Sequence, residues 1–200
     1  AQARAWLGAV DPAAPVSAYV HVPFCRSMCW YCGCHTTVTA RRAPVLRYLD
    51  ALAAEIELVA AALPAGVTLG HLHFGGGTPT LMEPDDFSRL MARLRARFAF
   101  AADAELAIEI DPRTLTGAMT AALAAGGINR ASLGVQSFDP AVQRAINRVQ
   151  SFAVTETAVQ ALRGAGIRAL NFDLIYGLPH QSVASCRDTV AQALALAPDR

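Results

Sequence analysis

The sequence predicts an α/β fold built on a parallel sheet, in the form of either a barrel or an open doubly wound sheet. Short apolar or β-branched runs alternate five times with longer stretches of helical periodicity, which is the pattern of strands joined by helical crossovers. The chain is also 54% hydrophobic and only 16% charged, which favours a large buried core.

The five predicted strands are short runs such as SAYVHV and ELAIEI. They occupy residues 17–22, 69–74, 105–110, 130–135 and 169–176. The predicted helices that follow them occupy residues 44–62, 85–98, 116–125, 151–164 and 182–196. Pro84-Asp85-Asp86 is typical of a helix start, and Gly126-Gly127 is typical of a helix end.

Polar residues stand at the carboxyl ends of these strands. A cysteine-rich loop follows the first strand and Gly75-Gly76-Gly77-Thr78 follows the second, while the later strands end near Glu109, Asp111, Gln136, Asp173 and Tyr176. In a parallel barrel these ends share one face, where active sites are built. We therefore expect a metal centre and a ring of polar side chains to meet at one mouth.

Composition narrows the class of protein further. A net charge of +1 argues against a nucleic-acid binder with a basic face, and the sequence has neither an export signal nor an apolar run near eighteen residues. Clustered cysteines in an odd number do not suit a secreted disulfide scaffold, so we expect a cytoplasmic protein without a membrane segment. A start without Met and an end just after a predicted helix suggest a piece of a longer chain.

The loop CRSMCWYCGC, residues 25–34, has three readings. Its thiols could be reduced and without a role, or they could form a zinc site of four cysteines or of three with His35. Three cysteines in one short loop better suit an iron-sulfur cluster, because zinc ligands usually come as two separated pairs. Three protein ligands to a 4Fe-4S cluster would leave one iron open to bind a substrate.

The CxxxCxxC loop resembles the signature of the radical S-adenosylmethionine enzymes. YVHVPFC, CGCH, HFGGGTPT, EIDPR, NRASLGVQSFDPAVQRAINRVQ and NFDLIYGLPHQS narrow the resemblance to the oxygen-independent coproporphyrinogen III oxidases. It runs from about residue 15 to residue 198. The resemblance implies a partial parallel (β/α)6 barrel truncated after the fifth βα unit, with a lead-in at residues 1–15 and the barrel at residues 16–200. The sixth strand and a C-terminal helical region would be missing.

The resemblance also assigns residues to roles. The cluster ligands would be Cys25, Cys29 and Cys32, and the catalytic residues would be Cys34, close to the cluster without binding it, and His21. The contacts to S-adenosylmethionine would come from Tyr19, Tyr31, Gly76, Gly77, Thr78, Glu109, Gln136, Arg148 and Asp173. Cys186 is expected in the core. Arg26, Arg41 and Arg42 could grip the substrate's propionates, although solvated surface charge is the commoner state of such residues.

The implied activity is oxidative decarboxylation of two propionates of coproporphyrinogen III to vinyl groups, giving protoporphyrinogen IX. A 4Fe-4S cluster and two molecules of S-adenosylmethionine would be the cofactors, a flavodoxin-type protein the one-electron donor, and a monomer the working form. Two alternatives stay open: a haem chaperone of the same superfamily, and a zinc-stabilised binding module. Chaperones usually follow the third cysteine with Asp-Phe, whereas this chain has Gly33-Cys34.

Overall fold

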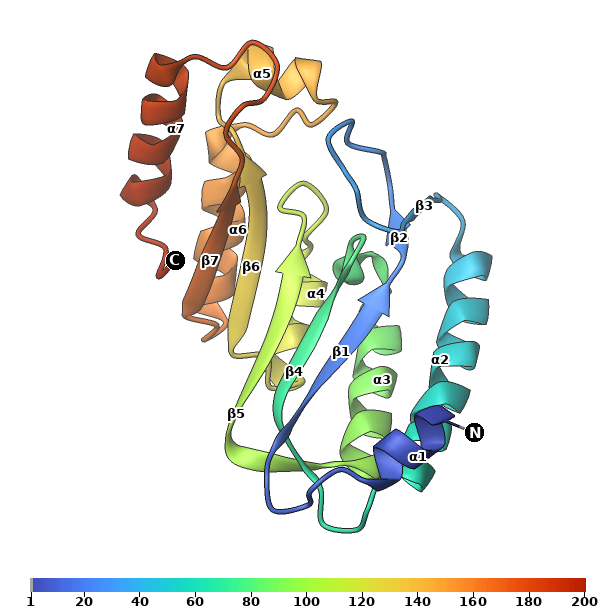
Figure 1. The fold of residues 1–200 in the computed structure, drawn as a ribbon. Coiled ribbons are helices and arrows are strands. Elements are labelled where there is room, and N and C mark those ends of the chain that lie inside the picture. Colours follow the sequence, from blue (N-terminus) through green and yellow to red (C-terminus); the bar gives the residue numbers. More distant parts are fainter. Residues whose placement is uncertain (1) are drawn as a thin grey trace.

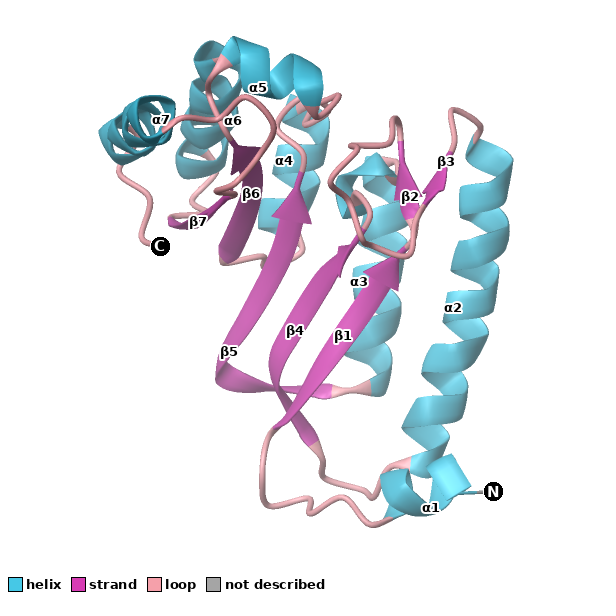
Figure 2. Ribbon diagram, turned by 45° about the horizontal axis from the view of Figure 1, so that its top comes forward, coloured by secondary structure: helices cyan, strands magenta, loops and turns pink. Residues whose placement is uncertain are grey.

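A computed structural model describes residues 2–200 and has one five-stranded parallel sheet with its helices on one side (Figures 1 and 2). The strand order is β1-β4-β5-β6-β7, and every neighbouring pair is parallel. The strands are β1 (Val16–Val22), β4 (Thr68–Gly76), β5 (Ala99–Ile110), β6 (Arg130–Gln136) and β7 (Ala169–Leu174). The predicted α/β class and parallel sheet are confirmed.

Five helices follow the strands as the periodicity predicts. They are α2 (Arg42–Ala62), α3 (Pro84–Arg97), α4 (Gly117–Ala125), α6 (Phe152–Gly164) and α7 (Val183–Ala195). The side chains of Thr116, Ser151 and Ser182 cap the N-termini of α4, α6 and α7 by accepting backbone N–H groups. Each of these three helices therefore begins at a defined residue.

The structure also contains short elements that the sequence pattern does not reveal. They are α1 (Gln2–Gly8), β2 (Phe24–Cys25), β3 (Thr37–Val38), the 3-10 helix η1 (Pro79–Leu81) and α5 (Pro140–Ala145). β5 begins at Ala99 instead of residue 105, and β7 ends at Leu174 instead of residue 176. Most of these differences lie at strand ends or in the loops between units.

The two faces of the sheet differ in character. Phe74, Ile108, Leu133 and Leu170 are completely buried against the helices, which cover the rear face in Figure 1. Side chains alternate along a strand, so the intervening residues point to the other face, which no helix covers in Figure 2. On that face Tyr19 is 57% exposed. One sheet face thus holds the core, and the other is available to the site.

Residues 199 and 200 pair with the free edge of β7. The Phe172 N–H donates to the Arg200 carbonyl at 2.9 Å, and the Asp199 and Arg200 N–H groups donate to the Leu170 carbonyl at 2.8 and 3.4 Å. Such staggered bonds are the pattern of a parallel ladder. They occur where the sequence analysis expects the next strand to begin.

No helix within residues 2–200 combines the length and the apolar character that crossing a bilayer requires.

Candidate functional site

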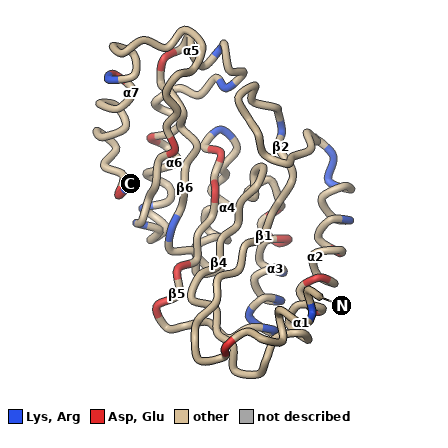
Figure 3. The backbone as a smooth tube through the Cα atoms, in the orientation of Figure 1, with Lys and Arg blue, Asp and Glu red and all other residues tan. Residues whose placement is uncertain are grey.

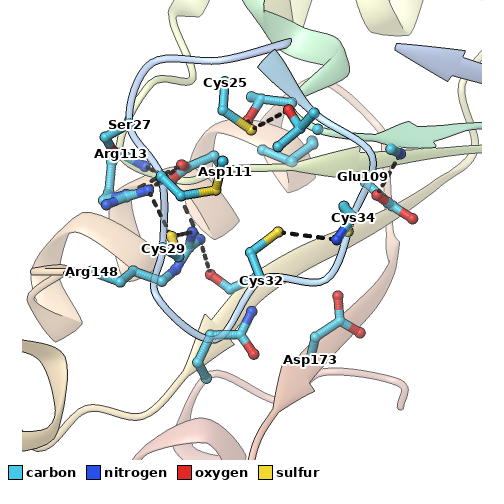
Figure 4. A pocket seen from close by; sticks show the side chains of 18 of the residues that line it. Cys25, Ser27, Cys29, Cys32, Cys34, Glu109, Asp111, Arg113, Arg148 and Asp173 are labelled. Atoms are coloured by element: carbon cyan, nitrogen blue, oxygen red, sulfur yellow. Dashed lines mark hydrogen bonds and ion pairs between the residues drawn. The ribbon is translucent and has the colours of Figure 1, made fainter. Parts of the chain in front are cut away.

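A cavity of about 230 Å³ opens at the carboxyl ends of the strands, beneath the cysteine-rich loop (Figure 4). The predicted site residues that line it are Cys25, Cys29, Tyr31, Cys32, Cys34, Gly76, Gly77, Thr78, Glu109, Gln136, Arg148 and Asp173. They come from the loop after β1 and from the ends of β4, β5, β6 and β7, with Arg148 following α5. The expected meeting of strand-end residues at one mouth is present in the fold.

The cysteine loop is closed at its base by two short strands. β2 and β3 pair in parallel, and the Thr39 N–H donates to the Cys25 carbonyl at 2.9 Å. The loop is also held at its outer end, because the Trp30 N–H donates to the Ile146 carbonyl at 3.0 Å and Asn147 Nδ2 donates to the Met28 carbonyl at 2.7 Å. Contacts from both sides of the cavity mouth therefore position the four thiols.

Each of the three predicted cluster ligands has donors near its sulfur. Thr36 and Thr78 hydroxyls lie 3.4 and 3.5 Å from Cys25 Sγ, and the Cys34 N–H lies 3.4 Å from Cys32 Sγ. Donors of this kind stabilise a thiolate, which is the form that binds metal. The surroundings of these sulfurs are therefore suited to thiolate ligands.

Cys29 lies between two guanidinium groups. Its sulfur is approached by Arg113 Nη2 at 3.9 Å and by Arg148 Nη1 at 3.6 Å, and the residue is only 9% exposed. Arg148 is itself 6% exposed, so it is not the solvated surface charge that an isolated arginine usually is. Cationic neighbours favour the thiolate form of a cysteine.

The two arginines share one carboxylate. Asp111 accepts from Arg113 Nη2 at 2.6 Å and from Arg148 Nη2 at 3.4 Å. Burial alone would raise the pKa of Asp111, but hydrogen bonds from Arg113 and the charges of both arginines outweigh it, so this pKa lies below its usual value. Arg113, Arg148 and Asp111 together leave one positive charge beside Cys29. Figure 3 shows basic and acidic residues side by side at this end of β5.

Arg113 was missed by the sequence reasoning. It stands in the stretch EIDPR, directly after a proline, where it reads as an ordinary loop charge. A signal was present, because Asp111 stands at the end of a predicted strand, and a carboxylate that becomes buried there needs a cationic partner. Arg113 is the nearest arginine in the sequence to that carboxylate.

The arrangement of the thiols fits a cluster better than a single ion. Among the His, Cys, Asp and Glu side chains of residues 2–200, no group of three converges closely enough to hold one metal ion. Zinc requires all its ligand atoms at about 2.0–2.3 Å from one point. The thiols instead border one side of a cavity, as the ligands of a larger sulfur-bridged group would. The zinc alternative is therefore not supported by the site.

The glycines at the end of β4 were expected to let a ligand approach the backbone, and they also allow close packing of the chain. Gly76 has a φ of +110°, and a Cβ there would lie 2.7 Å from the His21 ring. A Cβ on Gly77 would lie 2.6 Å from the Phe24 carbonyl oxygen. These distances are too short for real contacts, so both positions need glycine for the strand β2 and the site side chains to pack here.

Tyr19 and His21 lie beside the cavity and do not line it. His21 Nε2 is 2.9 Å from the His35 carbonyl oxygen, and His21 Nδ1 is 3.2 Å from the Tyr19 hydroxyl. A carbonyl only accepts, so His21 Nε2 carries the hydrogen. In the neutral ring Nδ1 then accepts, and the Tyr19 hydroxyl donates to it. The catalytic role of His21 stays a prediction.

Cys34 differs from the other three loop cysteines. Desolvation of its sulfur, together with its neighbours Cys32, Glu109 and Cys25, raises the pKa of Cys34 to about 11. In the metal-free protein this thiol therefore keeps its proton at neutral pH. The same residue borders the cavity, so it is available there as a neutral thiol.

Asp173 and Gln136 complete the opposite wall of the cavity. Asp173 accepts from the Ser132 hydroxyl at 3.0 Å and from Asn171 Nδ2 at 2.9 Å, yet burial and then the charge of Glu109 raise its pKa. Gln136 has a φ of +65°, which is unusual for a residue with a side chain. Its carbonyl accepts from Ile175, so the strained backbone joins the ends of β6 and β7.

Four other residues lie outside the cavity, and for three of them the sequence analysis named surface charge as the commoner state. Arg26, Arg41 and Arg42 are exposed and outside the cavity; Arg26 donates to the Ala40 carbonyl and Arg42 to Asp86. The structure therefore does not support binding of substrate propionates by these three arginines inside the cavity. Cys186 was expected in the core, but it is half-buried in an apolar depression on the outer side of α7, a face that no other element of residues 2–200 covers.

A family model described as the radical SAM superfamily matches residues 19–193. The chain therefore belongs to the radical SAM superfamily, the class of protein that the fold and the cysteine loop define. The chain is 57% identical over 195 residues to an oxygen-independent coproporphyrinogen III oxidase of Bradyrhizobium diazoefficiens, covering 98% of this chain and 43% of that protein. It is 48% identical to the enzyme of that name from Paracoccus denitrificans, covering 98% and 44%.

Solved structures agree with these relatives. Coproporphyrinogen III oxidase from Escherichia coli, a radical SAM enzyme, matches with a TM-score of 0.93 and 43% identity over 100% of this chain and 46% of that one. The methyltransferase TsrM from Kitasatospora setae matches with a TM-score of 0.61 at 17% identity, over 90% of this chain and 34% of that one, which shows the shared fold alone. The chain spans less than half the length of these oxidases.

Proposed function

We propose that the protein carries out the oxidative decarboxylation of two propionates of coproporphyrinogen III, giving protoporphyrinogen IX. The observation that carries the proposal is the cavity at the strand ends, where three cysteines of a CxxxCxxC loop share the lining with two arginines and with the carboxylates of Glu109 and Asp173. High identity to relatives named coproporphyrinogen III oxidase supports the choice of substrate. Membership of the radical SAM superfamily supports a 4Fe-4S cluster and S-adenosylmethionine as cofactors.

The cofactors would supply the difficult chemistry, a one-electron cleavage of S-adenosylmethionine that yields a radical able to take hydrogen from a propionate. Cys25, Cys29 and Cys32 would hold the cluster as thiolates. The other residues would orient the second cofactor and keep water from the reacting atoms.

Charge complementarity supports the roles of two cavity residues. The methionine part of S-adenosylmethionine carries an ammonium group and a carboxylate. Glu109 offers a carboxylate to the first, and Arg148 offers a buried guanidinium to the second. Asp111 holds Arg148 in place while leaving part of its charge uncompensated. Tyr31, Thr78, Gln136 and Asp173 would complete the contacts from the cavity wall, with Tyr19 beside them.

The remaining parts of the proposal concern partners. We infer a second molecule of S-adenosylmethionine, a flavodoxin-type one-electron donor, a monomeric state and a cytoplasmic location. The first three follow from the resemblance to the oxidases, and the location follows from the clustered cysteines. Nucleic acid is not proposed as a partner, because the net charge is only +1.

Product analysis under anaerobic conditions tests the proposal. The full-length protein, reconstituted with iron and sulfide, is incubated with S-adenosylmethionine, a strong reductant and coproporphyrinogen III. Protoporphyrinogen IX and methionine are expected from the native protein, and neither from Cys29→Ala. Intact coproporphyrinogen in the presence of cleaved S-adenosylmethionine would reject this substrate while keeping the superfamily chemistry.

The haem chaperone is the second candidate, and the Gly33-Cys34 sequence after the third cysteine disfavours it. A chaperone would bind haem stoichiometrically and pass it to an apoprotein without forming protoporphyrinogen. Haem titration of the reconstituted protein, followed by transfer to a haem-free acceptor, separates the two functions.

A further inference from the structure

His73 occupies the centre of the open sheet face, although no role was assigned to it from the sequence. It lies on β4 between Tyr19 on β1 and Glu109 on β5. Its ring stacks on the Tyr19 ring with a centroid separation of 5.7 Å and an interplanar angle of 12°. Its Nε2 atom lies 3.2 Å from Glu109 Oε1. One side chain therefore contacts both neighbouring strands.

The direction of the hydrogen bond to Glu109 follows from the groups involved. An ionised carboxylate only accepts, so His73 Nε2 must carry the hydrogen. The second carboxylate oxygen, Oε2, accepts from the Gly76 N–H at 3.1 Å. Both oxygens of Glu109 are thus held by donors of β4, one from a side chain and one from the backbone.

Gly75 lets the Glu109 carboxylate and the Tyr19 ring lie directly against the backbone of β4. A Cβ at this position would lie 2.7 Å from Glu109 Oε1 and 2.9 Å from Tyr19 Cε2. The Glu109 carboxylate and the Tyr19 ring therefore rest on the backbone of β4 itself. His73 borders the same space, so removing its ring would take one contact from each of these side chains.

We infer that His73 is a positioning residue that holds the Glu109 carboxylate in the orientation needed at the cavity. Glu109 lines the cavity and His73 does not, so His73 acts through Glu109. The inference rests on the proposed function, in which Glu109 contacts S-adenosylmethionine. A carboxylate bound at one oxygen only would rotate and lose part of that contact.

The test is the binding of S-adenosylmethionine to the full-length, cluster-loaded protein, measured by anaerobic equilibrium dialysis. His73→Ala should raise the dissociation constant about tenfold, because a hydrogen bond to a charged group is lost. His73→Gln supplies an amide donor without an aromatic ring, so it should restore most of the affinity. A dissociation constant for His73→Gln as high as that of His73→Ala would overturn the hydrogen-bonding role.

His71 provides a matched control. It lies two residues earlier on the same strand and the same face, and it is exposed. His71→Ala should leave binding unchanged, and a loss equal to that of His73→Ala would show a general effect of altering β4. Cluster content, measured by iron analysis, should be equal in all three variants.

A double-mutant cycle tests whether His73 acts through Glu109. In a Glu109→Gln background, His73→Ala should cause little further loss of binding, because the group it positions is already altered. A full additional loss would overturn the inference. If the native protein itself does not bind S-adenosylmethionine, the proposed function fails; if it binds and His73→Ala binds equally well, only the inference fails.

Discussion

The sulfur of Cys29 lies between the guanidinium groups of Arg113 and Arg148, which position it at the cavity. We expect replacement of Cys25, Cys29 or Cys32 by Ala to abolish both the iron-sulfur absorbance and S-adenosylmethionine cleavage, since a cluster with two protein ligands is labile. Iron analysis and visible spectra of anaerobically reconstituted protein measure this. Full iron content in Cys29→Ala would contradict the assignment.

Cys34 should behave differently from these three cysteines. Its raised pKa and its place beside the cavity are those of a neutral thiol, and three ligands already suffice for the cluster. We expect Cys34→Ser to keep its iron but to convert less porphyrinogen. Loss of iron from Cys34→Ser, measured alongside Cys29→Ala, would make Cys34 a ligand.

Asp111 contributes stability that depends on pH. Its pKa is lower in the folded protein than the unperturbed value of 3.8. Its contribution is therefore fully present above the unfolded pKa and is lost as the pH falls through the folded pKa. Asp111→Asn leaves Arg113 and Arg148 without their carboxylate, and we expect it to lower the free energy of unfolding at pH 7 by about 3–5 kcal/mol.

Urea unfolding at pH 7 and in acid checks this expectation. The difference between native protein and Asp111→Asn should begin to narrow below about pH 4, where Asp111 of the unfolded chain takes up a proton, and should narrow further as the pH falls through the lower folded pKa. Asp85→Asn, in the exposed first turn of α3, is the control and should cost less than about 1 kcal/mol. A difference that does not change with pH would show that the effect is not electrostatic.

Residues of the site were predictable where a motif assigns them a role. The four loop cysteines, Glu109, Arg148 and Asp173 could be named on this basis, and the fold brings them to one cavity. Arg113 and His73 stand in the quoted stretches EIDPR and HFGGGTPT but were not named, because their importance lies in contacts across strands and not in sequence spacing. The exposed positions of Arg26 and Arg42 likewise depend on how the loop packs.

At the level of elements, long periodic segments were predictable and short ones were not. The helices α2, α3 and α6 follow clear apolar repeats, and their bounds differ little from those expected. β2 and β3 contain two residues each, so no alternation exists to be read from the sequence. The early start of β5 at Ala99 escapes notice because the run AFAADAE has no strict alternation.

β2 is the element on which the cysteine loop depends. The N–H groups of Gly77 and Thr78 donate to the carbonyls of Val22 and Phe24 at 2.8 and 2.7 Å, which fixes β2 against the end of β4. Gly77→Ala would place its Cβ 2.6 Å from the Phe24 carbonyl oxygen and push β2 away. We expect a folded protein with reduced cluster content, measured by circular dichroism and iron analysis.

Gly117→Ala is the matched control for this change. Its Cβ would meet nothing within 4 Å, and the residue begins α4. Cluster content should equal that of the native protein, and stability should not fall. Equal cluster content in Gly77→Ala and Gly117→Ala would show that β2 tolerates the displacement.

The molecule as a whole has its two tryptophans far apart. Trp30 lies in the cysteine loop and is 71% exposed, while Trp6 lies on α1 at the opposite end of the sheet (Figure 1). An iron-sulfur cluster absorbs light that tryptophan emits, and energy transfer to it falls steeply with distance. We therefore expect reconstitution to quench Trp30 strongly and Trp6 weakly.

Fluorescence of single-tryptophan variants measures this difference. Trp6→Phe retains Trp30 and should lose most of its emission when the cluster forms, whereas Trp30→Phe should retain most of its emission. Equal quenching in both variants would contradict a cluster at the loop. The parallel order of the five strands was predictable from the βα alternation. The sheet face without helices follows from the partial barrel that the resemblance implies, because the helices of such a barrel cover its outer face alone.

The strand order β1-β4-β5-β6-β7 is also the order in which the ribosome makes the strands. Each new strand can pair with one that has already emerged, so the sheet can grow from its first edge during translation. The loop cysteines emerge early, however, and Arg148 follows 119 residues after Cys29, on the order of ten seconds later at typical synthesis rates. The thiols thus precede their cationic neighbour, which favours loading of the cluster after Arg148 has emerged.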